Sequence, residues 1–112
     1  MTFYEYTQNN SGGHFEVNDK LCHRVFIEAD NLDEADSIAE SLGVYFNGVS
    51  DGIDCGCCGD RWYSGDEADL SESNIEEYAQ FLADEYGWTS PDARIFYKDG
   101  TVTEINKRKG VR

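Results

Sequence analysis

Hydrophobic and polar side chains alternate most regularly between residues 20 and 29. Alternation with a period of two predicts a β-strand, because successive side chains of a strand point to opposite faces. We expect one of these faces to lie in the core: Leu21, His23, Val25, Ile27 and Ala29. A shorter run of aromatic and β-branched residues predicts another strand at residues 3–7.

Residues 31–42 have apolar side chains at the spacing of a helix that buries one side. Asn31 is suited to cap the free N–H groups at the start of this helix, and Glu34 would complete a capping box. Gly43 supplies the left-handed residue at which such a helix ends.

A second helix is predicted to begin near residues 71–73, where Ser73 and Glu76 have the spacing of a capping box, and to end at Gly87. Its apolar side would be formed by Ile75, Tyr78, Ala79, Leu82 and Tyr86. Its solvent side would be formed by Glu76, Glu77, Gln80 and Asp84.

The remaining apolar runs predict a short strand at residues 44–46 and a β-hairpin at residues 94–106, with a type I′ turn at Asp99–Gly100. Because short turns join successive strands, we expect a mostly antiparallel sheet with two helices packed on one face. The fold class is therefore α+β. We expect a single small acidic domain at residues 1–106, followed by a basic tail at residues 107–112.

The charge of the chain is strongly negative and unevenly distributed. Its 112 residues include 23 acidic and 9 basic side chains, a formal net charge of −14, and six of the basic ones lie in residues 94–112. Such a body repels nucleic acid and anionic membranes, and it attracts basic surfaces over a distance of ~8 Å at physiological salt. We expect a basic protein partner, with no direct binding to nucleic acid or membrane. The alternative is that the negative charge only keeps the protein soluble and marks no binding surface.

The segment between Arg61 and Arg94 contains no basic residue. An ordinary solvated helix mixes acids and bases in pairs four residues apart, so a run of acids alone indicates a functional surface. Carboxylates arrayed along a helix and a loop can imitate a phosphate backbone and occupy a basic groove built for nucleic acid. We predict a partner-binding surface formed by Asp66, Glu67, Asp69, Glu72, Glu76, Glu77, Asp84, Glu85, Trp62 and Tyr63. The alternative position for Trp62 is the core.

The cysteines allow a second hypothesis. Cys55 and Cys58 have the C-x-x-C spacing that lets two thiolates bind one zinc ion, and further ligands would have to come from Cys22 or Cys57 and a histidine. We expect no cofactor. The alternative is a structural zinc ion in a protein–protein adaptor that acts on another host protein.

Catalysis and secretion find no support in the sequence. A Ser-His-Asp elbow, a Gly-rich phosphate loop and a His-Glu-x-x-His helix are all missing, so we expect no enzyme activity. No basic start followed by an apolar run opens the chain, and no stretch approaches the ~18 apolar residues of a membrane span. We expect a cytoplasmic protein with reduced cysteines.

Four segments resemble a family of small bacteriophage proteins, and the match covers about residues 3–63. The segments are residues 22–29 (CHRVFIEA), 34–43 (EADSIAESLG), 45–49 (YFNGV) and 54–62 (DCGCCGDRW). Small acidic phage proteins of this type also resemble anti-CRISPR proteins that act on type II-A systems. The resemblance implies that the partner is a type II CRISPR effector nuclease or its guide-RNA complex in the host bacterial cytoplasm. It also implies that guide RNA assembly or DNA recognition is blocked by occupancy. The resemblance assigns no contact residues.

Overall fold

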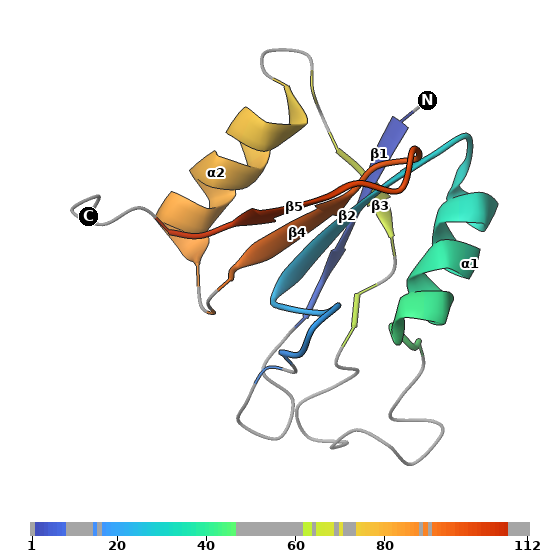
Figure 1. Cartoon of the computed structure of the whole chain (residues 1–112), viewed down its shortest axis with the longest axis horizontal. Helices are drawn as coiled ribbons and strands as arrows, with labels where there is room; N and C mark the ends of the chain where they lie inside the picture. The colour runs from blue at the N-terminus through green and yellow to red at the C-terminus, as the bar shows by residue number, and fades with distance from the viewer. Residues whose placement is uncertain are drawn as a thin grey trace.

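The computed structural model describes residues 2–8, 15, 17–46, 62–63, 65–68, 70, 74–87, 89 and 91–107. Within these residues five strands and two helices form an α+β fold (Figure 1), which confirms the predicted fold class. Their bounds are β1 Thr2–Thr7, β2 Arg24–Ala29, α1 Leu32–Leu42, β3 Asp66–Glu67, α2 Ile75–Tyr86, β4 Ala93–Phe96 and β5 Val102–Ile105.

The strands form one sheet in the order β3-β1-β2-β4-β5. Strand β1 pairs antiparallel with β2 and β3, and β4 pairs antiparallel with β5, as expected for most of the sheet. The pair β2–β4 is parallel, with Arg24 opposite Ala93. A parallel pair needs a crossover connection, and here that connection contains both helices. The sheet is therefore mixed, with β2 at its centre.

The two helices cover opposite faces of the sheet, so the prediction that they share one face was wrong (Figure 1). Val25 and Ile27 of β2 pack in a cluster with Ala39 of α1. Phe26, between them, packs in a second cluster with Ala79 of α2. Since neighbouring side chains of a strand point to opposite faces, this division places one helix on each side. Both faces of β2 are buried, although alternation predicted only one buried face.

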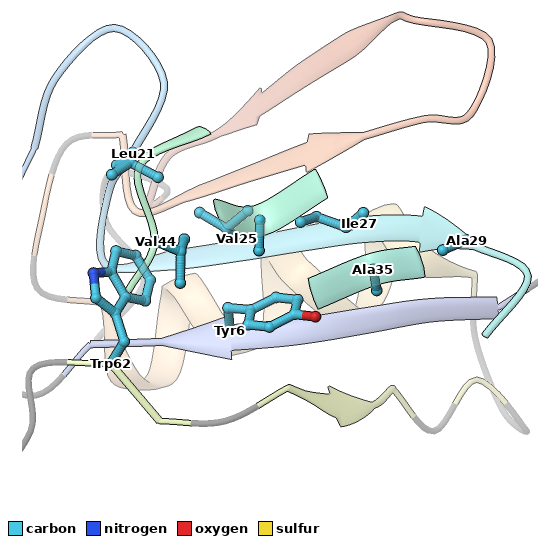
Figure 2. Close-up of a cluster of buried hydrophobic side chains, with 9 residues drawn as sticks. Tyr6, Leu21, Val25, Ile27, Ala29, Ala35, Val44 and Trp62 are labelled. Atoms are coloured by element: carbon cyan, nitrogen blue, oxygen red, sulfur yellow. The ribbon is translucent and has the colours of Figure 1, made fainter. Parts of the chain in front are cut away.

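The cluster on the α1 side joins four parts of the chain (Figure 2). Tyr6 of β1 and Trp62 lie beside the β2 residues, and Leu21 and Val44 close one end. Val44 donates its N–H to the carbonyl of Ala39 at 3.0 Å, which closes the end of α1. The predicted strand at residues 44–46 is absent from these described positions, because the backbone there completes the helix end.

Local signals located the helix ends well. Asn31 caps α1 by accepting from the N–H of Glu34 at 2.8 Å, although the Glu34 carboxylate bonds to the N–H of Asp30 instead of closing the box on Asn31. Gly43 ends α1 with a φ of 112°. Helix α2 is capped by Asn74 with Glu77, one residue after the predicted pair.

The predicted hairpin is present, but its loop differs from the predicted type I′ turn. The N–H of Gly100 donates to Tyr97 at 3.0 Å, and the N–H of Tyr97 donates to Thr101 at 2.9 Å. Three residues therefore separate the last bonded pair, and Gly100 has a φ of 96°. This is the longer hairpin loop that ends in a left-handed glycine.

Candidate functional site

The predicted acidic surface is divided between the two faces of the sheet. In β3, Glu67 lies opposite Tyr4, and Asp66 lies opposite Glu5. Tyr4 packs against the α1 cluster, so Glu67 points to the α1 side and Asp66 to the α2 side. Both acids are exposed at the sheet edge, where charged side chains also discourage pairing with another strand.

Helix α2 presents most of the predicted acids that are described, with one correction. Glu76, Glu77 and Glu85 are exposed, whereas Asp84 is only 3% exposed, so its predicted place on the solvent side was wrong. The amide of Gln80 donates to the Asp84 carboxylate at 3.0 Å and to the carbonyl of Asn106 at 2.8 Å. The chain after β5 therefore lies against this side of α2, which a helical projection of the sequence cannot show.

The exposed side of α2 carries two aromatic rings that the sequence analysis did not place there. Phe81 is 54% exposed and Tyr86 is 58% exposed. Their ring centroids lie 6.4 Å apart at an interplanar angle of 84°, an edge-to-face pair. Tyr86, predicted on the apolar side, is the last residue of α2 and is exposed there. For Phe81 the signal was available, because at helical spacing it falls between Glu77 and Glu85 on the charged side.

We call the set Glu77, Phe81, Glu85 and Tyr86 the α2 face. Glu77 and Glu85 lie one turn before and one turn after Phe81. Glu77 also accepts from the N–H of Asn74 at 3.4 Å in the capping box. Next to this face, Glu76 accepts from the hydroxyl of Tyr97 at 2.7 Å. Burial and this bond raise the pKa of Tyr97 to about 12.

Helix α1 is as acidic as α2 but differs in its partners. Neither helix contains a lysine or arginine. At the start of α1, however, Lys98 contacts Asp30 at 2.8 Å and Glu34 at 3.1 Å. The hydrogen bond and the charge of Lys98 hold the pKa of the Asp30 carboxyl below its usual value. Lys98 thus partly neutralises the negative charge of α1 within the molecule. Helix α2 differs from α1 because its exposed acids lie beside exposed aromatic rings.

The two aromatic residues predicted to bind a partner have different positions. Trp62 is 2% exposed and belongs to the α1-side cluster (Figure 2). It therefore lies in the core, the alternative to the predicted binding surface. Within the described part of the chain, its indole Nε1 has no hydrogen-bond partner. Tyr63 is exposed, and its backbone N–H donates to Thr7 at 3.0 Å. Asp69 and Glu72 lie outside the described residues.

The zinc hypothesis stays a prediction, because Cys55, Cys57 and Cys58 also lie outside the described residues. Cys22 is described and buried, and its thiol donates to the carbonyl of Arg24 at 3.2 Å. Burial raises the pKa of this thiol to about 11, which opposes formation of the thiolate that zinc binds. Across the positions that the structure describes, no group of three or more His, Cys, Asp or Glu side chains is arranged to hold a metal ion.

A buried charge network lies where β2 and β4 begin, and the sequence analysis missed it. The Asp92 carboxylate, which is fully buried, contacts His23 Nδ1 at 2.9 Å and an Arg24 guanidinium nitrogen at 3.1 Å. Arg24 also donates to Glu5 at 2.8 Å. His23 and Asp92 are 69 positions apart, so no local pattern reveals the network. It ties three strands together, and we assign it a structural role.

Together, these features define a small mixed α+β protein with one exposed helix face that combines acids and aromatic rings. The chain belongs to the family described as domain of unknown function (DUF7296), which matches residues 1–111. No curated protein and no solved structure matches it significantly. Neither of the described helices is long and apolar enough to cross a membrane.

Proposed function

We propose that the protein binds a basic host protein through the α2 face and inhibits it by occupying a groove that normally holds nucleic acid. The observation that carries this proposal is the exposed pair Phe81 and Tyr86 beside Glu77 and Glu85. Protein interfaces are enriched in aromatic anchors at their centre and place charges at their rim. The carboxylates would steer a positively charged partner to the surface, and the rings would supply the apolar contact.

The partner we propose is a type II CRISPR effector nuclease or its guide-RNA complex, in the cytoplasm of a host bacterium. The support is the resemblance of this small acidic chain to anti-CRISPR proteins, together with the basic channels in which such effectors hold RNA and DNA. Blocking guide RNA assembly or DNA recognition needs occupancy only, so no catalytic residue is required of the inhibitor.

The α2 face alone is smaller than a stable interface. Specific complexes bury roughly 1,200–2,000 Å² in total, so neighbouring residues must take part. Glu76 adjoins the face, and Asp66 points to the same side of the sheet. These residues would extend the negative surface from α2 toward the β3 edge.

Charge neutralisation on two sides of the molecule tests this proposal. The site variant carries Glu76→Gln, Glu77→Gln and Glu85→Gln, and glutamine at position 77 can preserve the helix cap. The control variant carries Asp19→Asn, Asp33→Asn and Glu40→Gln, which are exposed acids away from α2. Both variants change the net charge by the same amount.

The measurement is inhibition of DNA cleavage by a reconstituted type II effector, with binding followed in a pull-down. We expect the site variant to lose at least about tenfold in inhibition, as each desolvated charge pair contributes on the order of 1 kcal/mol. The control should retain inhibition. Equal losses would show that net charge matters and the α2 face does not, and full inhibition by both variants would contradict acidic mimicry.

A further inference from the structure

The exposed rings of the α2 face form a platform that is already in place before any partner arrives. The edge-to-face contact between Phe81 and Tyr86 restrains both rings, so less side-chain entropy is lost on binding than for two separate exposed rings. An aromatic ring carries partial negative charge on its face, and in an edge-to-face pair the edge of one ring covers only one face of the other, so the remaining ring faces stay uncovered by the pair. Such a surface attracts a cation as well as apolar groups.

Carboxylates border this platform on two sides. Glu77 and Glu85 are each four residues from Phe81, which is about 6 Å along the helix axis. The negative end of the helix dipole lies at the same end as Tyr86. No basic side chain occurs on α2 itself, and Lys98 is engaged with acids near α1. The carboxylates and the helix dipole therefore make the field over the two rings favourable for a positive charge.

The same charges decide which occupant fits. A second copy of this chain would bring its own Glu77 and Glu85 against these carboxylates, and like charges repel. A neutral apolar partner would bury the carboxylates without compensation, which is costly. A lysine ammonium is compact and strongly hydrated, whereas an arginine guanidinium is planar, stacks on aromatic rings and can bind a carboxylate through two nitrogens.

From this geometry we infer that the α2 face is a receptor for an arginine side chain of the partner. The guanidinium lies against the Phe81 and Tyr86 rings and donates to Glu77 or Glu85. The inference rests on the proposed function for the identity of the partner, while the preference for arginine over lysine is a property of the surface alone.

The test uses the full chain and two capped peptides, hexa-arginine and hexalysine, which have the same charge. Binding is followed at low salt through the backbone amide shifts of the protein in NMR titrations. Hexa-arginine should bind about 5- to 30-fold more tightly, the range expected for one or two kilocalories of cation–π attraction. The largest shifts should fall in residues 77–87.

Three leucine variants separate ring chemistry from hydrophobicity. Phe81→Leu and Tyr86→Leu keep an apolar side chain but remove the ring, so each should reduce the affinity for hexa-arginine toward that for hexalysine. Tyr63→Leu removes an equally exposed ring elsewhere and should leave the preference unchanged. Equal affinity of the unmodified protein for both peptides, or shifts centred on α1, would overturn the inference.

These titrations contain no effector, so the two proposals can fail separately. If hexa-arginine is preferred at α2 but the neutralised site variant still inhibits the effector, the receptor stands and the proposed function is wrong. If inhibition depends on α2 but the protein binds hexa-arginine and hexalysine equally, the proposed function stands and the inference of an arginine receptor is wrong.

Discussion

Replacement of Asp92 by asparagine removes the central charge of the buried network while keeping the shape of the side chain. The Asp92 carboxylate is fully buried and contacts His23 and Arg24, and one of its oxygens accepts from the N–H of Thr89 at 3.4 Å. In Asp92→Asn, the guanidinium of Arg24 retains Glu5 as a charged partner, but it loses the partner that lies deepest in the protein.

The expected magnitude follows from the burial of both charges. Arg24 is 6% exposed and Asp92 is fully buried, so water cannot replace the lost contact without rearrangement. Removal of one member of a buried ion pair costs about 3–5 kcal/mol. That is a large part of the roughly 5–15 kcal/mol by which domains of this kind are stable. With a denaturant slope of about 1.5 kcal/mol per M of urea, the midpoint should fall by about 2–3 M.

Urea denaturation followed by far-UV circular dichroism measures this change. Asp19→Asn is the matched control, because Asp19 is exposed in a turn and its replacement should change stability by less than about 0.5 kcal/mol. The double variant Arg24→Met with Asp92→Leu removes both charges and should be more stable than Asp92→Asn. A loss below about 1 kcal/mol for Asp92→Asn would refute the reasoning, since it would mean that the buried Arg24 does not need this partner.

Three further outcomes are expected. Raising the salt concentration from about 0.1 M to 0.5 M should weaken the complex with the proposed basic partner about tenfold or more in pull-down or calorimetric assays, and a salt-insensitive complex would indicate an apolar interface. Gly65→Ala should cost about 1–3 kcal/mol in urea denaturation, because a Cβ there would lie 2.7 Å from the Tyr6 ring. Because burial raises the pKa of Cys22 from 9.0 to about 11, the folded state holds this proton more tightly. Stability should therefore fall as the pH rises from 9 to 11, and Cys22→Ala should lose that part of the alkaline decline.

The features that the sequence predicted well are those set by neighbouring residues. The cap at Asn31, the end of α1 at Gly43 and the hairpin around Gly100 depend on contacts within a few positions. The sides on which the helices pack depend on which strands become neighbours. Alternation along β2 placed Phe26 away from the core, and only α2, from a distant part of the chain, gives that face a cover.

In the candidate site too, the positions set by local helical spacing were predicted correctly, and those set by distant parts of the chain were not. Helical spacing correctly placed Glu76 and Glu77 in solvent. It failed for Asp84, which is buried and accepts from Gln80, a residue whose amide also donates to the backbone beyond β5. Phe81 was overlooked because a hydrophobic residue was not expected on a charged side, although the spacing itself would have located it.

The parallel pairing of β2 with β4 affects how the chain reaches its fold. Arg24 and Asp92, which join these strands at their start, are 68 residues apart. Closing a loop of that length costs about 2.5 kcal/mol more entropy than closing a four-residue hairpin. During synthesis, the edge of β2 that pairs with β4 would therefore remain unpaired until the last two strands emerge. A fragment of residues 3–63 lacks β4 and should not fold when expressed alone.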